Sequence, residues 1–233
     1  MNRFLACAIL SITPLFAAES AAPAGLAGLL GATGLTSAQL LSGLKSGLGT
    51  ALDLSTGELA KPGAFQMPVP PSMAKLESAV KKLNQTGLLD SFKASLNQSA
   101  ASVAPQTTAA MKESVGALTL DDAAALTGGG SDAATKLLRK AAEPVLRAKL
   151  MPLVAQAIAS NGSAAKAKEL ATKAGPMAAM LGVPSAGDLE GYVFTQLLDT
   201  SFAYLAKQEA ALRANPGAMK DKFAALVFGA AKK

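Results

Sequence analysis

Apolar residues recur at helical spacing along most of the chain, most regularly after Ser72. Serine, threonine or aspartate stands at most segment starts, as helix caps do; Thr119 and Asp122 form a capping-box-like pair. No hairpin signal appears. The pattern predicts an all-α fold, one multi-helix domain with about seven helices. The segments read as helical are 37–54 (short and weak), 72–84, one from Asp90 that Pro105 interrupts, 119–128, 131–160, 163–181, 188–214 and 217–228.

The other segments divide the chain. We expect residues 1–20 to be a signal peptide and 21–61 to be a flexible glycine-rich segment that contains the short helix. Four prolines between Ser55 and Pro71 favour an extended linker. The helical domain is then expected over 62–229, followed by a basic tail at 230–233.

The helix over 131–160 has a charged stripe opposite an apolar one. The stripe keeps its register through Pro144, so Pro144 is expected to kink the helix without ending it. Beyond Arg147 the pattern rotates, and the break is expected at Pro152. The stripe consists of Asp132, Lys136, Arg139, Lys140, Glu143 and Arg147.

The helix over 188–214 has one apolar face, with Asp199 and Arg213 on the opposite side. Tyr192 and Phe202 lie off that face, one on either side of the polar arc. They are candidates for a second contact surface, which a partner or an apolar ligand would use. The alternative is that they pack against a neighbouring helix of the same chain, because helices in bundles commonly bury a wide stripe.

Composition supports the helical prediction and excludes several chemistries. Ala (51) and Leu (35) far outnumber Val (9) and Ile (3), which favours helix over sheet. Histidine is absent, and Cys7 is the sole cysteine. The chain therefore has no Ser–His–Asp or Cys–His catalysis and no His-based zinc site. No cofactor or metal site and no catalytic residue are predicted.

The N-terminus has the layout of a secretory signal peptide. An apolar run over 4–16 follows Arg3, and small residues follow the run. The run is too short to span a bilayer, and Pro14 argues against a core helix. Cleavage is expected near residue 20, with Ala18, Ala22 and Ala24 as other possible ends. The sequence thus predicts a periplasmic or secreted protein.

A Ser-x-x-Lys pattern, used by serine hydrolases with a lysine base, occurs four times. Chance and serine caps before lysine-bearing helices account for it, and the companion Ser-Asp-Asn and Lys-Thr-Gly motifs are absent. The chain is therefore expected not to be an enzyme. The four pairs are Ser42/Lys45, Ser72/Lys75, Ser78/Lys81 and Ser163/Lys166.

A polar loop is the remaining candidate site. Its glycines lead into a helix N-terminus, where free N–H groups attract anions, and its aspartates suggest calcium. Helix capping explains the same residues without a ligand, and the spacing is not that of an EF-hand. The candidate residues are Asp121, Asp122, Gly128, Gly129, Asp132 and Arg139.

The net charge of +6 comes mostly from scattered lysines, with no aromatic residue interleaved among the basic pairs. Nucleic acid is therefore not an expected partner. An anionic lipid, an envelope polymer or an acidic protein is more compatible with an exported, weakly cationic chain. The glycines spaced through residues 21–36 leave a membrane-active glycine zipper as an alternative to a flexible terminus.

Several segments, in order and spacing, resemble the bacterial domain of unknown function 4197 family from about Leu40 to Gly229. The resemblance implies an exported, helical protein and supplies no catalytic residue. The chain departs from the family at Leu137 and Leu138, where members commonly have aromatic residues, and at Ala101, where members have an acidic one. The segments are 97–105, 120–126, 128–139 with Ala133-Ala134-Thr135, Arg213–Pro216 and Val227–Gly229.

Two functions fit these features. The first is a non-enzymatic cell-envelope interaction or scaffold protein that works through exposed helix faces. The second is a periplasmic carrier that holds an apolar or amphiphilic, lipid-like ligand between Ala- and Leu-rich helices. A cavity large enough for an acyl chain would distinguish the carrier from the scaffold.

Overall fold

A computed structural model describes residues 24–84, 86–124, 130–175 and 184–230. These residues form helices and connecting segments without a strand, which confirms the all-α prediction. The predicted signal peptide lies outside them. Among the described residues there are nine α-helices and two short 3-10 helices, Pro71–Met73 and Pro216–Ala218. The α-helices are α1 (Ala24–Thr33), α2 (Ser37–Leu59), α3 (Ala74–Lys82), α4 (Thr86–Ala117), α5 (Leu120–Ala124), α6 (Ala133–Ser160), α7 (Ser163–Lys173), α8 (Ala186–Ala214) and α9 (Lys222–Ala230).

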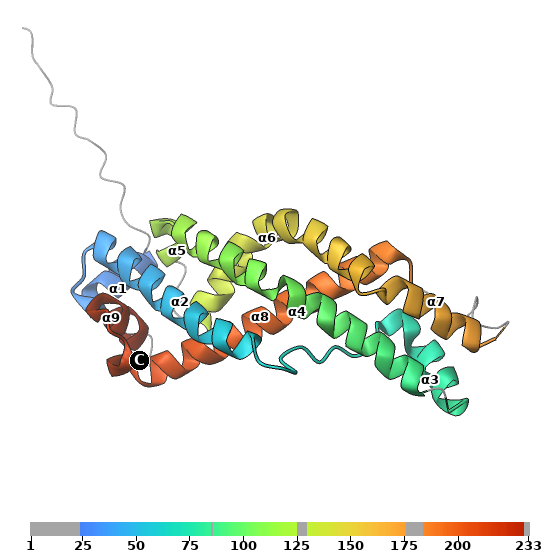
Figure 1. Cartoon of the computed structure of the whole chain (residues 1–233). Helices are drawn as coiled ribbons and strands as arrows, with labels where there is room; N and C mark the ends of the chain where they lie inside the picture. The colour runs from blue at the N-terminus through green and yellow to red at the C-terminus, as the bar shows by residue number, and fades with distance from the viewer. Residues whose placement is uncertain (1–23, 85, 125–129, 176–183, 231–233) are drawn as a thin grey trace, which may run out of the picture.

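The molecule is elongated (Figure 1). The long helices α4 and α8 run along most of its length with α6 beside them, while α3 and α7 lie at one end and α1, α2, α5 and α9 at the other. One continuous apolar core joins the two ends. Its largest fully buried side chains include Phe92, Phe194 and Phe228, one each from α4, α8 and α9. No helix in the described ranges is both long and apolar enough to cross a membrane.

Helix α2 differs from the short, weak helix expected over 37–54. It continues to Leu59 and buries a face that includes Leu40, Leu44 and Leu48. Two glycines of that face let α9 approach closely: a Cβ at Gly43 would lie 2.7 Å from the backbone of Phe223, and one at Gly47 would overlap the Phe228 ring. Glycine lowers helix propensity, but here it permits a close packing that offsets the loss.

Two predicted helix breaks are wrong. Helix α4 continues through Pro105, and α6 continues through Pro152, where its break was expected. Helix α6 also continues through Pro144, as expected, and it bends along its length (Figure 1). Pro105 leaves the carbonyl of Ala101 without its helical N–H partner, but Ala101 is exposed, so water can reach it. Packing of α4 against α6, α2 and α8 holds the helix together on both sides of the proline.

The expected linker over 55–71 is only partly found: α2 continues to Leu59, turns follow over 60–64, and a 3-10 helix begins at Pro71. Only residues 65–70 between them have no helix or turn. Their alternate side chains Phe65, Met67 and Val69 are buried. The Met67 N–H donates to Asn97 Oδ1 of α4 at 2.8 Å. The segment is therefore part of the core and not a free linker.

Candidate functional site

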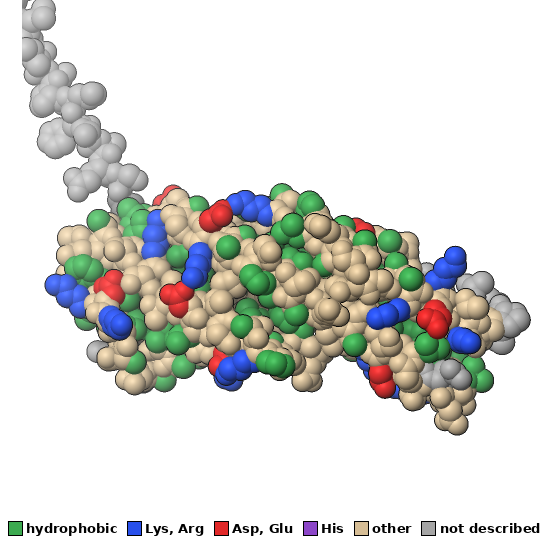
Figure 2. Space-filling model, viewed as in Figure 1, with side chains coloured by type: hydrophobic (Ala, Val, Ile, Leu, Met, Phe, Trp, Pro, Cys, Tyr) green, Lys and Arg blue, Asp and Glu red, His purple; other side chains and the backbone are tan. Residues whose placement is uncertain are grey.

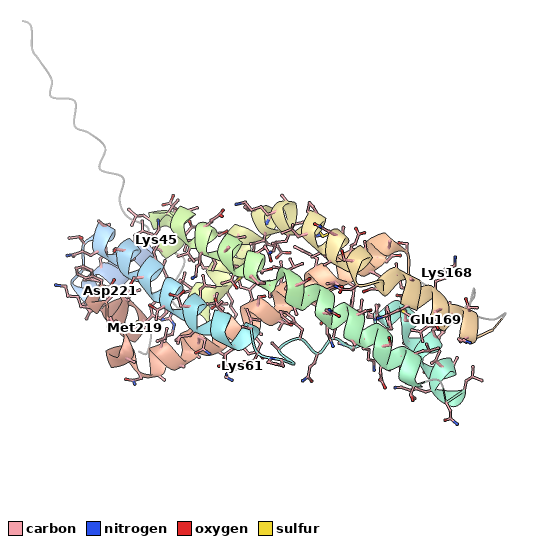
Figure 3. All side chains as sticks on the ribbon, viewed as in Figure 1. Lys45, Lys61, Lys168, Glu169, Met219 and Asp221 are labelled. Atoms are coloured by element: carbon pink, nitrogen blue, oxygen red, sulfur yellow. The ribbon has the colours of Figure 1, made fainter. Side chains whose placement is uncertain are left out.

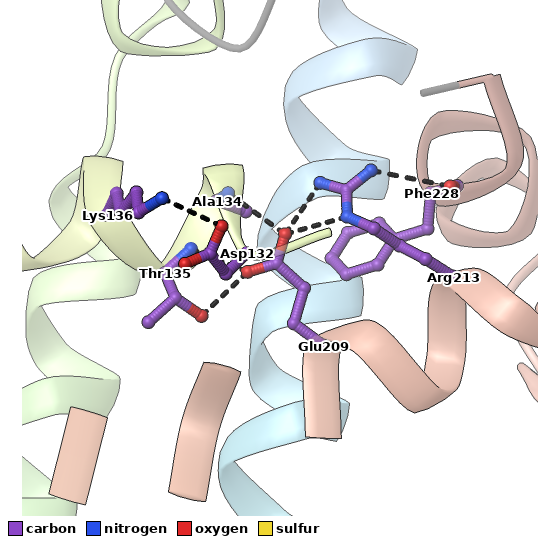
Figure 4. A network of polar contacts seen from close by, with 7 residues as sticks. All are labelled: Asp132, Ala134, Thr135, Lys136, Glu209, Arg213 and Phe228. Atoms are coloured by element: carbon purple, nitrogen blue, oxygen red, sulfur yellow. Dashed lines mark hydrogen bonds and ion pairs between the residues drawn. The ribbon is translucent and has the colours of Figure 1, made fainter. Parts of the chain in front are cut away.

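The most concentrated polar chemistry of the described chain is a buried ion pair on α8. Glu209 is fully buried, and its Oε1 accepts from Arg213 Nε and pairs with Nη2, each at 2.7 Å. The two residues are four apart, so one helical turn brings them together. Figure 4 shows the pair between α6, α8 and α9. We refer to Glu209, Arg213 and their partners as the Glu209 cluster.

Glu209 caps the N-terminus of α6. Its two carboxylate oxygens accept from the backbone N–H of Ala134 at 2.9 Å and of Thr135 at 2.7 Å, and from the Thr135 hydroxyl at 2.6 Å (Figure 4). The free N–H groups of a helix start carry partial positive charge, so a carboxylate there is stabilised. The carboxylate thus has three hydrogen-bond donors in addition to Arg213, which offsets its loss of water.

Arg213 links the same cluster to α9. Its Nη1 donates to the carbonyl of Phe228 at 3.3 Å, and its guanidinium carbon lies 4.7 Å from the centre of the Phe228 ring. The cluster therefore joins the start of α6, the end of α8 and the end of α9. Among the described residues no buried side-chain nitrogen or oxygen lacks a hydrogen-bond partner, so the cluster is closed and presents no free group to a ligand.

The cluster corrects two sequence expectations. Arg213 was placed on the polar side of its helix, but it is buried because α9 covers that side of the end of α8. Ser131 and Asp132 were expected to cap α6, but the N-cap residue Asp132 makes no capping hydrogen bond, and Glu209 from another helix supplies it instead. Reading one helix at a time cannot find a cap that comes from 75 residues away.

The candidate residues of the predicted polar loop that the structure describes contact other residues and not one another. Asp122 forms a reciprocal capping box with Thr119, as predicted, and Asp132 pairs with Lys136 at 3.0 Å. Asp121 is exposed on α5. Gly128 and Gly129 lie outside the described residues. Within the described ranges, no three acidic or cysteine side chains are grouped as a metal site would need.

Arg139, the last member of that set, lies between α6 and α8. Its Nη2 lies 2.5 Å from Asp199 Oδ1, and Nε lies 3.9 Å from Glu143 Oε2. Its guanidinium carbon lies 5.5 Å from the centre of the Phe202 ring. Both ends of the ion pair are partly exposed, at 38% for Arg139 and 45% for Asp199.

Tyr192 and Phe202, the proposed second contact surface, both contact other parts of the chain. Phe202 is buried under Arg139. The Tyr192 hydroxyl donates to the carbonyl of Pro68 at 2.8 Å, and partial burial raises the pKa of the Tyr192 hydroxyl above its ordinary value. Tyr192 thus fastens the extended segment between α2 and α3 to α8.

Two lysines of the four Ser-x-x-Lys pairs donate to backbone carbonyls of other segments. Lys45 donates to the carbonyl of Gly116 at 2.7 Å, and Lys166 to that of Ser91 at 3.4 Å. Ser163 is fully buried beside Ser99, with their hydroxyl oxygens 3.4 Å apart. Neither lysine is therefore placed to act as a base on its serine.

Charged caps hold the same end of the molecule as the Glu209 cluster. Asp221 accepts from the N–H groups of Phe223 at 2.8 Å and Ala224 at 3.3 Å, which caps α9. A hydrogen bond from Ser46 of α2, followed by these two backbone bonds, holds the pKa of Asp221 below its ordinary value. Asp221 and Lys45 both lie at this end of the molecule (Figure 3).

The sequence analysis did not identify Glu209 and Arg213 as a buried pair. The small number of arginines in the chain was a signal that could have pointed to Arg213. The chain has 18 lysines and only four arginines. All three arginines in the described ranges, Arg139, Arg147 and Arg213, lie over a phenylalanine of another helix. A planar guanidinium stacks on a ring better than an ammonium does, so the rare arginines mark helix junctions.

Three segments that carry the family resemblance meet at the Glu209 cluster. Ala133–Thr135 supplies the N–H donors, Arg213 begins a second segment, and Phe228 lies in the third. A family model described as "Protein of unknown function (DUF4197)" matches residues 34–229, from the turn before α2 into α9. Neither the curated proteins nor the solved structures contain a match. The chain therefore belongs to the DUF4197 family of proteins of unknown function.

Proposed function

We propose that this protein is a non-enzymatic interaction or scaffold protein of the bacterial cell envelope, exported through its N-terminal signal peptide. The observation that carries the proposal is that the described core uses its own polar groups: every buried side-chain donor or acceptor there has a partner. A catalytic or ligand site commonly leaves polar groups ready for a substrate. A closed core leaves the outer helix faces as the parts available for binding, and on the face seen in Figure 2 the basic and acidic side chains are scattered among hydrophobic ones.

The surface grooves support a scaffold more than a carrier. Four surface grooves in the described part of the chain hold between about 90 and 320 Å³ and open to solvent. Pockets that enclose most of a small ligand typically hold about 300–1,000 Å³, so three of the four grooves are too small and the largest, at about 320 Å³, reaches only the lower end of that range. The most apolar of the grooves, lined by Leu59, Ala104, Pro105 and neighbours, is also the smallest at about 90 Å³.

The carrier remains the second candidate because one larger groove is partly apolar. It holds about 260 Å³ between α4, α5 and α6, and half-exposed Val145 lies in its wall. Glu113 and Asp122 also line it, which suits a ligand with a cationic or hydrogen-bonding head more than a plain acyl chain.

Native mass spectrometry of the full-length protein purified from its own host tests scaffold against carrier. We expect the mass of the polypeptide alone. A stoichiometric lipid adduct that survives gentle desolvation would favour the carrier. The Val145→Asp variant, which charges the groove wall, serves as the matched control, because it would remove an adduct bound there.

N-terminal sequencing of the same material tests export. We expect the mature chain to begin between residues 19 and 25, after cleavage near residue 20. Recovery of intact Met1 from an envelope fraction would contradict the proposed cleavage.

A further inference from the structure

Two arginines of α6 lie over two phenylalanines of α8 in the same way. Arg139 covers Phe202, with 5.5 Å from guanidinium carbon to ring centre, and Arg147 covers Phe194 at 4.5 Å. The arginines are eight residues apart, and so are the phenylalanines, in the opposite order along the chain. The two helices therefore run antiparallel and repeat one motif twice. Both rings are buried beneath their guanidinium groups.

The two copies of the motif differ at one residue of α8. In the first copy Asp199, three residues before Phe202, pairs with Arg139. The matching position in the second copy, three residues before Phe194, is Gly191. The second motif thus has the stacked arginine and the ring but not the carboxylate.

The missing carboxylate leaves open space. A Cβ built on Gly191 would meet no atom within 4 Å, and Arg147 is exposed. In the described part of the chain no ion pair joins Arg147 to a carboxylate; Glu143, one turn away, pairs with Arg139. Lys140 lies on the same charged stripe and has no ion pair within the described ranges either. Glu143 on α6 and Glu190 beside Gly191 are the acidic residues nearest to this position in sequence.

We propose that Arg147, held over Phe194 beside Gly191, receives an aspartate or glutamate carboxylate from an acidic protein partner, which takes the place that Asp199 has at Arg139. Stacking restricts the guanidinium before binding, and its planar fork matches a carboxylate. The intramolecular copy is a carboxylate presented by a helix, so a polypeptide is the favoured source. The inference rests on the proposed interaction function and names its partner chemistry.

The test measures binding of a fluorescein-labelled decaglutamate peptide to the full-length protein by anisotropy at low salt. We expect Arg147→Ala to weaken binding by at least about fivefold, because one charge-assisted contact is lost. Arg147→Lys keeps the charge but lacks the fork, so an intermediate loss is expected. Lys140→Ala removes one positive charge from the same stripe, and we expect less than about a twofold change.

Gly191→Asp gives the sharper test, because it supplies the missing carboxylate from within the chain. We expect it to weaken peptide binding as much as Arg147→Ala does. Gly191→Ala adds a Cβ without charge and is expected to bind like wild type. Asp199→Gly removes the closer of the two carboxylates at Arg139, leaving Glu143 at 3.9 Å, and is expected to strengthen binding. Melting curves of all variants identify any that fail to fold, and the Asp199→Gly gain cannot arise from unfolding.

Equal peptide binding by wild type, Arg147→Ala and Gly191→Asp would overturn the inference, as would equal losses in Arg147→Ala and Lys140→Ala. Binding of phosphatidylglycerol vesicles and of inorganic phosphate is measured in parallel, to test whether the site prefers a phosphate group to a carboxylate. Binding of either that depends on Arg147, without peptide binding, would assign the site to a phosphate group and overturn the acidic protein partner. None of these outcomes depends on the native mass measurement. A result that contradicts the scaffold proposal can therefore be told apart from one that contradicts the Arg147 site.

Discussion

Two arginine–carboxylate pairs, each with its carboxylate on α8, have the same chemistry and different surroundings. Glu209–Arg213 and Asp199–Arg139 each join a carboxylate to a guanidinium that lies over a phenylalanine. The first pair has side-chain exposures of 0% and 6%, the second of 45% and 38%. Exposure decides what each pair does: the buried pair fixes how three helices meet, whereas water can replace either partner of the exposed pair.

Removing the buried charge gives the largest expected effect. In Glu209→Gln, Arg213 stays buried without a countercharge, and the N–H groups of α6 lose their carboxylate. We expect the free energy of unfolding to fall by about 3–5 kcal/mol, measured by urea denaturation. Glu169→Gln on the exposed surface of α7 is the control and should change it by at most about 0.5 kcal/mol. A loss below about 1 kcal/mol in Glu209→Gln would remove the basis for the comparison.

A double variant sharpens the same point. Glu209→Leu with Arg213→Met removes both buried charges at similar volume, so no unpaired charge remains. We expect the double variant to unfold at a higher urea concentration than Glu209→Gln, because an unpaired buried charge is worse than none. If the double variant is the less stable of the two, the hydrogen bonds that cap α6 matter more to stability than the cost of leaving Arg213 buried without a countercharge.

The contact between α2 and α9 tests whether the Glu209 cluster depends on close helix packing. In Gly47→Ala the new methyl group would overlap the Phe228 ring and push α9 away from Arg213. We expect a loss of about 1–3 kcal/mol in the free energy of unfolding. Gly49→Ala is the matched control in the same helix: its Cβ meets nothing within 4 Å, so a gain of up to about 1 kcal/mol is expected. Equal effects of the two variants would contradict the close packing.

The exposed pair is expected to matter far less. Asp199→Asn leaves Arg139 solvated and still over Phe202, so the free energy of unfolding should change by less than about 1 kcal/mol. The residual effect should disappear in about 1 M salt, because salt screens exposed charges. A loss comparable to that of Glu209→Gln would show that exposure does not separate the two pairs.

The sequence alone predicted what depends on neighbours along the chain. The helical class and the Thr119–Asp122 capping box are local features, and the structure confirms them. The non-helical proline segment is found only in part, because α2 continues to Leu59. The burial of α2 was missed because its glycines lower helix propensity, while their benefit comes from contact with α9. Glu209 was missed because its partners at the start of α6 lie far away in sequence.

The proline errors have the same origin. A proline removes one hydrogen bond, and whether a helix survives that loss depends on what packs on either side. In α4 the residues around Pro105, including Val103 and Thr107, are buried against other helices. Local rules predict a break there, and tertiary packing prevents it.

The smallest expected effect concerns Asp221, the half-buried cap of α9, whose lowered pKa makes its contribution to stability depend on pH. Hydrogen bonds from Ser46, Phe223 and Ala224 hold the pKa of Asp221 below its ordinary value of 3.8. A lowered folded pKa means that the cap contributes stability above the unfolded pKa and loses that contribution as pH falls through the folded one. We therefore expect the melting temperature to decline below about pH 4, and Asp221→Asn to reduce the decline slightly. Thermal melts from pH 7 to pH 2.5 provide the measurement. Because Asp221 is partly exposed to water, its share of the decline is expected to be small. A decline removed entirely by Asp221→Asn would place the acid sensitivity of the fold in this one cap.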